Sequence, residues 1–94
     1  AFCDRFGNIE TNIPGQMLEI FKLQPGDHLE IIMDKNSYNA VYFESYGLAK
    51  KGQILVHTDS SGFVEIAVNQ GSAQKILHVR QTTNQITIEK HITI

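Results

Sequence analysis

Alternating apolar and polar residues dominate the middle of the chain and predict β-strands. Between His28 and Asp34, one face would carry Leu29, Ile31 and Met33, and the other His28, Glu30 and Ile32. A repeat of two residues is that of a strand with one buried face. A polar break at Lys35-Asn36 separates this run from a second one over residues 37–43. The two runs therefore predict a β-hairpin.

Further strands are predicted over residues 53–58, 63–68 and 85–94. In the last of these, Ile86, Ile88, Ile92 and Ile94 share one face. Turn sequences at 25–27 and 50–52 bound the runs. Helical spacing is confined to Gln16–Leu23 and to a turn or two that Ser72 would cap, ending at Leu77. Six or so short strands indicate an all-β barrel or sandwich, and we expect a small antiparallel β-barrel with one or two short helical segments.

Composition excludes several classes of protein. The chain has 94 residues, enough for a single domain, and shows no internal repeat or interdomain linker. Eight Lys and Arg residues against ten Asp and Glu give a net charge of −2, so nucleic acid is not an expected partner. No apolar run is long enough to cross a bilayer, and no secretion signal is visible. A single cysteine, Cys3, fits a reducing compartment and a buried apolar role, so we expect a cytoplasmic location.

Two polar motifs beside strand sequences form a candidate ligand site. The first is Asp4-Arg5-Phe6-Gly7-Asn8, in which the Asn8 amide offers a donor and an acceptor that match an adenine edge. Asp4 can accept hydrogen bonds from an ammonium group. In the second motif, the hydroxyls of Ser60 and Ser61 and nearby backbone N–H groups can hold a carboxylate. Tyr46, in a segment of small residues, can stack on a base.

Each of these residues also has a purely structural interpretation. Asp4 and Asn8 stand beside a glycine, where aspartate and asparagine are common turn residues. The Ser60-Ser61-Gly62 stretch is equally typical of a β-turn, and Tyr46 of a half-buried rim residue. The residues alone therefore indicate a small β domain with a polar site of undetermined use.

The chain offers no convincing catalytic base or metal site of its own. Its four histidines, His28, His57, His78 and His91, have no metal-ligand spacing and no adjacent nucleophile. For His57, a cross-strand or rim role is simpler than a catalytic one. Glu65 would share a face with Phe63 and Ala67, and we expect it to be partly buried and hydrogen-bonded. We expect no metal ion and no cofactor.

The two motifs resemble a known family. Residues 4–14, Asp-Arg-Phe-Gly-Asn followed by Thr-Asn-Ile-Pro, and residues 61–73, Ser-Gly-Phe-Val-Glu-Ile-Ala-Val-Asn-Gln-Gly-Ser-Ala, are similar to the C-terminal domain of the S-adenosyl-L-methionine (SAM) hydroxide adenosyltransferases. The resemblance covers essentially the whole chain. It implies a β-barrel whose partner is an α/β N-terminal domain, and trimers that bind SAM between one subunit's N-terminal domain and its neighbour's C-terminal domain. The chain begins at Ala1 without an initiator methionine, so we expect residues 1–94 to be the C-terminal piece of a longer two-domain protein.

The resemblance also implies a role for each motif residue. Asn8 would bind the adenine edge, Tyr46 would stack on the base, and backbone groups of Val68 and Gln70 would complete the adenine contacts. Asp4 would bind the methionine amine, Ser60 and Ser61 the carboxylate, and Phe6 would line the pocket. The family's halogenating members carry arginine at the positions of Ser61 and Val68, so these two residues favour the hydrolase.

Two functions remain open at this stage. The first is the substrate-binding half of a SAM hydrolase, which forms adenosine and L-methionine by displacement at the ribose 5′ carbon. Such a fragment is expected to be inactive alone, because the resemblance puts the base in the N-terminal domain. The second is a stand-alone β-barrel binding or assembly module without catalytic activity.

Overall fold

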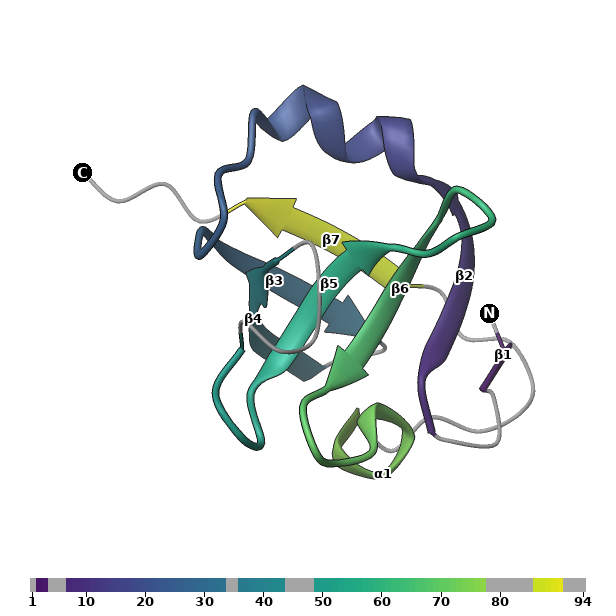
Figure 1. Cartoon of the computed structure of the whole chain (residues 1–94), viewed down its shortest axis with the longest axis vertical. Coiled ribbons are helices and arrows are strands. Elements are labelled where there is room, and N and C mark those ends of the chain that lie inside the picture. The colour runs from purple at the N-terminus through teal and green to yellow at the C-terminus, as the bar shows by residue number, and fades with distance from the viewer. Residues whose placement is uncertain (1, 4–6, 34–35, 44–48, 78–85, 91–94) are drawn as a thin grey trace.

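The structure is a computed structural model that describes residues 2–3, 7–33, 36–43, 49–77 and 86–90. Its strands are β1 (Phe2–Cys3), β2 (Ile9–Pro14), β3 (His28–Met33), β4 (Asn36–Tyr42), β5 (Ile54–Thr58), β6 (Phe63–Val68) and β7 (Ile86–Lys90). They form one sheet in the order β1-β2-β6-β5-β4-β3-β7. Figure 1 shows that the sheet curls on itself, so that β7 lies behind β5 and β6. The all-β, barrel-like fold expected from the alternating pattern is therefore confirmed.

The strand predictions were accurate where one face is buried. Leu29, Ile31 and Met33 of β3 are all buried, and β3 pairs with β4 as the expected antiparallel hairpin. Strand β6 covers the predicted residues, and β5 begins one residue later than predicted. In the last strand, β7 ends at Lys90, and the predicted residues 91–94 lie outside the described part of the chain.

Two features of the sheet differ from the sequence prediction. The two N-terminal strands were not predicted: β1 pairs with β2, and β2, whose residues were assigned to a polar motif, pairs with β6 along Ile9↔Ile66 and Glu10↔Glu65. Strands β4 and β5 run parallel, with Val41 opposite Leu55, whereas every other neighbouring pair among the described strands is antiparallel. A parallel pair requires a crossover, here the connection between Tyr42 and Ile54.

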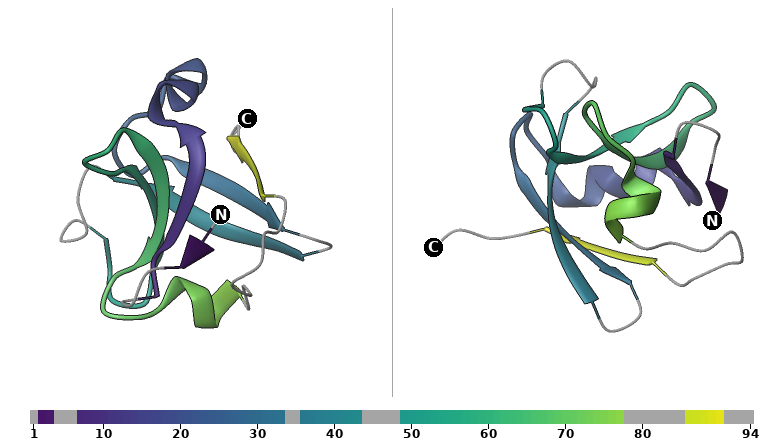
Figure 2. Two further views of the ribbon diagram at one scale, coloured as in Figure 1. Left: turned by 90° about the vertical axis from the view of Figure 1, so that its right-hand side faces the viewer. Right: turned by 90° about the horizontal axis from the view of Figure 1, so that it is seen from below.

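Two short helices lie at opposite ends of the curled sheet (Figures 1 and 2). The first, η1 (Gly15–Phe21), is a 3₁₀ helix, and it joins β2 to β3 at one end. The second, α1 (Ala73–Leu77), follows β6 at the other end. As predicted, Ser72 caps α1, because its Oγ accepts the N–H of Lys75 at 3.3 Å. The helix predicted over residues 16–23 is therefore the 3₁₀ helix η1, which ends two residues earlier. Among its apolar residues, Met17 and Ile20 are exposed and Leu18 is buried.

The inside and the outside of the curled sheet have different apolar clusters. The inner face holds the main core, which includes Ile9, Leu29, Ile31, Val64 and Ile66. Cys3 is buried in this core, as expected for a small apolar side chain. The outer face has a smaller cluster of Val41, Ala49, Leu55 and Ala67. In the part of the chain that the structure describes, no helix has the length and apolar character needed to span a bilayer.

Candidate functional site

The described site residues form two groups at the two ends of β6. Ser60 and Ser61 precede β6 in its hairpin with β5, on the side of η1, where the Gly15 N–H donates to the Gly62 carbonyl at 2.7 Å. Asn8, Val68 and Gln70 lie at the other end, beside α1, where the Gln74 N–H donates to the Gly7 carbonyl at 2.9 Å. Five residue steps along β6 separate the two ends by about 17 Å. A ligand that contacts both groups must therefore extend along β6.

The corner that carries Asn8 depends on the absence of a side chain at Gly7. Gly7 has a φ of +83°, which L side chains rarely adopt. A Cβ there would also come within 2.8 Å of the Ser72 Cβ and closer still to its Oγ. Ser72 leads into α1, so the glycine allows β2 to start directly against that helix. Asn8 is half-buried at this junction.

Asn69, which was not predicted as a site residue, links this end of β6 to Ala49 by a hydrogen bond. Its Nδ2 donates to the Ala49 carbonyl at 2.7 Å, and its own carbonyl accepts the Gly52 N–H at 2.8 Å. Gln70, the next residue, is exposed with a left-handed φ of +56°. The structure thus brings Ala49, three residues after Tyr46, to the end of β6 where Gln70 lies.

Val68 can contribute to a ligand site only through its backbone. Its side chain is buried in the main core, and its carbonyl already accepts the Gly71 N–H at 3.2 Å. The expected backbone contact of Val68 with a ligand stays a prediction. A carbonyl oxygen has a second lone pair that remains for a ligand.

The hairpin that carries Ser60 and Ser61 is organised by Asp59. The Asp59 Oδ1 accepts the N–H of Ser61 at 2.8 Å and the N–H of Phe63 at 3.1 Å. The Gly62 N–H closes the turn by donating to the Asp59 carbonyl at 3.1 Å. Ser60 and Ser61 are both exposed on this turn. The turn interpretation of this motif is therefore correct, and it leaves both hydroxyls open to solvent.

A row of ionisable side chains crosses the outer face of the sheet beside this turn. Glu10 on β2 pairs with Glu65 on β6, which pairs with His57 on β5. His57 and Glu65 are buried, and their Nε2 and Oε1 atoms are 2.7 Å apart. The expected cross-strand role of His57 and the expected burial of Glu65 are both confirmed. Oxygens of Glu10, Asp59 and Glu65 all lie within 4.8 Å of one another.

Two carboxyl groups of this cluster, those of Glu10 and Asp59, have pKa values shifted in opposite directions. The hydrogen bond with Glu65 is the main cause that raises the pKa of Glu10 to about 8, and burial and Asp59 add to it. The Phe63 N–H, with help from Glu10 and the Ser61 N–H, lowers the pKa of Asp59 below its usual 3.8. Glu10 is therefore protonated at neutral pH, and its O–H group donates a hydrogen bond to a neighbouring carboxylate. Acidic clusters are common without a cation.

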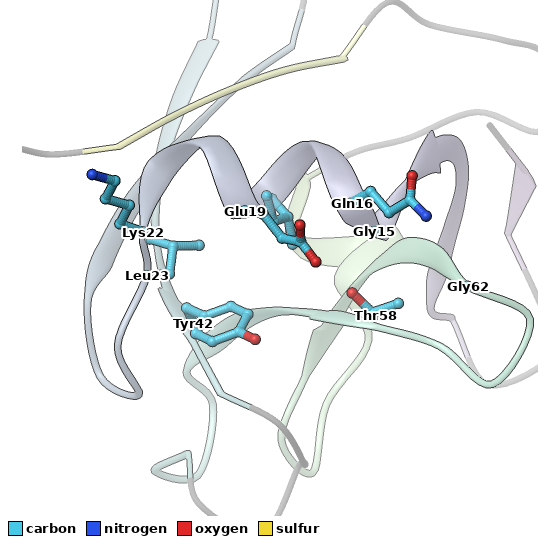
Figure 3. Close-up of a pocket in the computed structure, with 9 residues that line it drawn as sticks. Gly15, Gln16, Glu19, Lys22, Leu23, Tyr42, Thr58 and Gly62 are labelled. Carbon is cyan, nitrogen blue, oxygen red and sulfur yellow. The ribbon is translucent and has the colours of Figure 1, made fainter.

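A groove of about 540 Å³ lies between η1 and the ends of β4 and β5. Figure 3 shows Glu19 and Gln16 on the helix side, facing Tyr42 and Thr58. Its other lining residues are Gly15, Leu18, Lys22, Leu23 and Gly62. None of the five predicted site residues that the structure describes lines this groove, although Gly62 directly follows Ser61. Asp4, Phe6 and Tyr46, the other three, lie outside the described residues.

Comparison with known proteins identifies the family. Residues 1–85 match the family model described as the SAM hydroxide adenosyltransferase C-terminal domain. The chain belongs to this family. It is 34% identical over 76 residues to proteins named (R)-S-adenosyl-L-methionine hydrolase from Salinispora tropica and Salinispora arenicola, and the match covers 81% of this chain. It spans only 26% of the length of these relatives.

Solved structures also resemble this SAM hydroxide adenosyltransferase domain. An uncharacterized conserved protein from Thermotoga maritima superposes with a TM-score of 0.85 at 34% identity, over 97% of this chain and 34% of that protein. A conserved hypothetical protein from Thermus thermophilus gives a TM-score of 0.62 at 21% identity, over 95% of this chain and 32% of that protein. The second likeness concerns the fold alone.

Proposed function

We propose that this chain is the substrate-binding part of a SAM hydrolase, which converts SAM and water into adenosine and L-methionine. The observation that carries the proposal is the presence, in a chain of this family, of polar groups at both ends of one strand. Asn8 and Gln70 at the α1 end suit the adenine, and the Ser60-Ser61 turn suits the methionine carboxylate. SAM carries these two groups at its opposite ends, so a ligand extended along β6 would contact both.

The rest of the site would come from outside this chain. The relatives named as hydrolases are about four times as long as the matched part. We propose that an N-terminal domain of a neighbouring subunit, in a homotrimer, covers the ligand and supplies the base that activates water. The residues of this chain would then act by holding the adenosine and methionine ends in line for displacement at the 5′ carbon, an effect worth on the order of 7 to 11 kcal/mol when the geometry is ideal.

Full-length protein is expected to release adenosine from SAM, and this chain's adenine contacts are expected to govern KM. Asn8→Ala should raise KM about tenfold, since one paired amide contact to a base is worth about 1 to 3 kcal/mol. Tyr46→Ala should have a similar effect through lost stacking, whereas Tyr46→Phe keeps the ring and should stay near wild type. Chromatographic measurement of adenosine gives kcat and KM for each variant.

Asn39→Ala is the matched control, because Asn39 is an exposed asparagine on β4, opposite Glu30. Its KM should equal that of the wild type. If Asn8→Ala and Tyr46→Ala also leave adenosine release unchanged, the proposed site is wrong. If full-length protein binds SAM without releasing adenosine, the stand-alone binding module is the better description.

The isolated 94-residue chain is expected to bind SAM or adenosine only weakly, with a Kd in the millimolar range or above. Half a pocket leaves the ligand largely exposed to water, whereas complete sites bury about 70 to 90% of a ligand of this size. Isothermal titration calorimetry measures this directly. A micromolar Kd for the isolated chain would contradict a site shared with another domain.

A further inference from the structure

The Ser60-Ser61 turn is connected to an ionisable network that the proposed reaction does not use. We propose that Asp59, held in place by Glu10, Glu65 and His57, positions this turn to receive the ligand's carboxylate and makes that binding sensitive to pH. The inference rests on the proposed function for the ligand, but the positioning itself can be measured without any ligand.

Asp59 fixes the turn through its side chain and its backbone. One carboxylate oxygen of Asp59 accepts two backbone N–H groups, from Ser61 and from Phe63. The Asp59 N–H donates to the Phe63 carbonyl at 2.8 Å, which closes the hairpin on both sides. Any displacement of the Asp59 side chain therefore changes the direction in which the Ser61 N–H and hydroxyl point.

The network behind Asp59 has a fixed position in the sheet. Glu65 is buried on β6, and its Oε1 lies 2.7 Å from the Nε2 of His57 on the neighbouring strand β5. Glu10 stands opposite Glu65 on β2, and its carboxyl hydrogen-bonds to both Glu65 and Asp59. Glu10 therefore links the exposed turn to a buried pair within the sheet.

Ionisable groups surround Glu10 on the side of β6, whereas β1 on the other side places Phe2 opposite it in the register. Strand β6 gives Glu65, β5 gives His57, and the hairpin gives Asp59. On the other side of the turn, η1 and the residue after it carry Glu19 and Lys22 along the groove. Residues 4 and 5, an aspartate and an arginine that precede β2, lie outside the described residues. When Glu10 is protonated, its carboxylic acid group donates a hydrogen bond to the carboxylates of Glu65 and Asp59. With Glu10 ionised, three carboxylates face one another, repelling Asp59 and an incoming ligand carboxylate alike.

The direction of the pH effect follows from the raised pKa of Glu10. The pKa of Glu10 is about 8 when the turn is in place, and Asp59 contributes part of this rise, after Glu65 and burial. Displacement of the turn removes the Asp59 part, so the pKa of Glu10 falls, while Glu65 still holds it above its usual 4.5. Protonated Glu10 therefore favours the ordered turn at acidic and neutral pH, and this support is lost as the pH rises through about 8. The measured KM of full-length protein for SAM should rise over the same range.

Hydrogen–deuterium exchange of full-length protein tests the positioning in the absence of ligand. Wild type and Glu10→Gln are compared at the same pH, so that intrinsic exchange rates cancel. The glutamine amide still donates a hydrogen bond but cannot ionise. Between about pH 5.5 and about pH 8.5, exchange of a peptide covering residues 59–63 should become about tenfold faster in wild type than in Glu10→Gln, the factor that one unit of pKa represents. A peptide covering β4 should show no such divergence.

Kinetics of the same variants test the link to the ligand. KM of the wild type should rise with pH several-fold more than that of Glu10→Gln, with kcat alike in both. Asp59→Ala should raise KM at every pH, whereas Asp59→Asn keeps an acceptor oxygen for the Ser61 N–H and should recover most of the loss. Glu89→Gln, on the exposed face of β7, should behave as wild type.

Each outcome has a distinct meaning. Equal exchange of the 59–63 peptide in wild type and Glu10→Gln at all pH values, or an equal change in β4, would overturn the positioning role. Divergent exchange combined with matching KM profiles would overturn the link to the ligand. Absence of adenosine release from wild type would overturn the proposed function and the ligand part of this inference with it.

Discussion

Replacing Gly7 with alanine is expected to reduce the free energy of unfolding by about 2 to 5 kcal/mol. A left-handed φ of +83° costs an L residue about 1 to 2 kcal/mol. The added methyl group would also overlap Ser72, and overpacking of this kind costs about 1 to 3 kcal/mol. Urea denaturation of the 94-residue chain measures the loss. The same variant in full-length protein should raise KM, because Asn8 follows Gly7 directly.

Two further variants separate the backbone strain at Gly7 from the overlap of an added methyl group with Ser72. Gly52 has a similar φ of +80°, but no atom lies within 4 Å of the position that an added methyl group would take, so Gly52→Ala should show the backbone cost alone. In a Ser72→Gly background, Gly7→Ala should reduce the free energy of unfolding by only about half as much as it does in the wild type. If Gly7→Ala and Gly52→Ala are equally destabilising, the contact between Gly7 and Ser72 does not constrain the Asn8 corner.

The fold was predictable wherever burial imposes a repeat of two residues. Strand β3 alternates between buried and less buried residues, so the alternating pattern located it almost to the residue. Strand β6 is buried at five consecutive positions and β4 only at Ala40 and Val41, yet both lie within one residue of the predicted runs. Strand β2 was missed because Thr11 occupies one of its buried positions. The Thr11 hydroxyl donates to the Val64 carbonyl at 2.7 Å, which satisfies a polar group on the inner face. A threonine of this kind cannot be recognised without the partner strand.

Long-range pairing explains the other differences. The parallel pairing of β4 with β5 depends on the path of the connection between them, and no local pattern specifies that path. The Glu10 cluster was not predicted for the same reason. Glu10 and Glu65 are far apart in the sequence and lie side by side only because of the register between β2 and β6. By contrast, the role of Asp59 has a local signature. An aspartate before Ser-Ser-Gly is typical of a turn in which the side chain accepts backbone N–H groups.

The described residues of the candidate site lie at the two ends of β6, with Asn8, Val68 and Gln70 at one end and Ser60 and Ser61 at the other. That arrangement was not visible in the sequence, because it depends on the pairing of β2 with β6. A ligand that contacts both groups would have to extend along β6. The roles of all these residues stay predictions that rest on the family resemblance, and Asp4, Phe6 and Tyr46 lie outside the described residues.

The stability of the chain is expected to fall as the pH rises from about 4.5 to about 8. The pKa of Glu10 is raised in the folded state, chiefly by its hydrogen bond with Glu65, so the folded state holds a proton that the unfolded chain releases. Stability from this group is complete below 4.5 and is lost as the pH passes through about 8. One proton sets a limit of about 1.4 kcal/mol per pH unit, and we expect about 0.5 because Glu10 is partly open to water.

Asp59 produces the opposite trend at lower pH. Its pKa is lowered in the folded state, so its contribution is present above the usual value of 3.8 and is lost as the pH falls below it. The contributions of these two groups to stability are together greatest at about pH 4. Urea denaturation of the 94-residue chain at a series of pH values measures this profile. Glu10→Gln should flatten the decline above pH 4.5, and Asp59→Asn should flatten the decline below it. Since the other ionisable groups are common to all three proteins, an unchanged slope in Glu10→Gln would show that Glu65 and Asp59 do not hold the Glu10 proton.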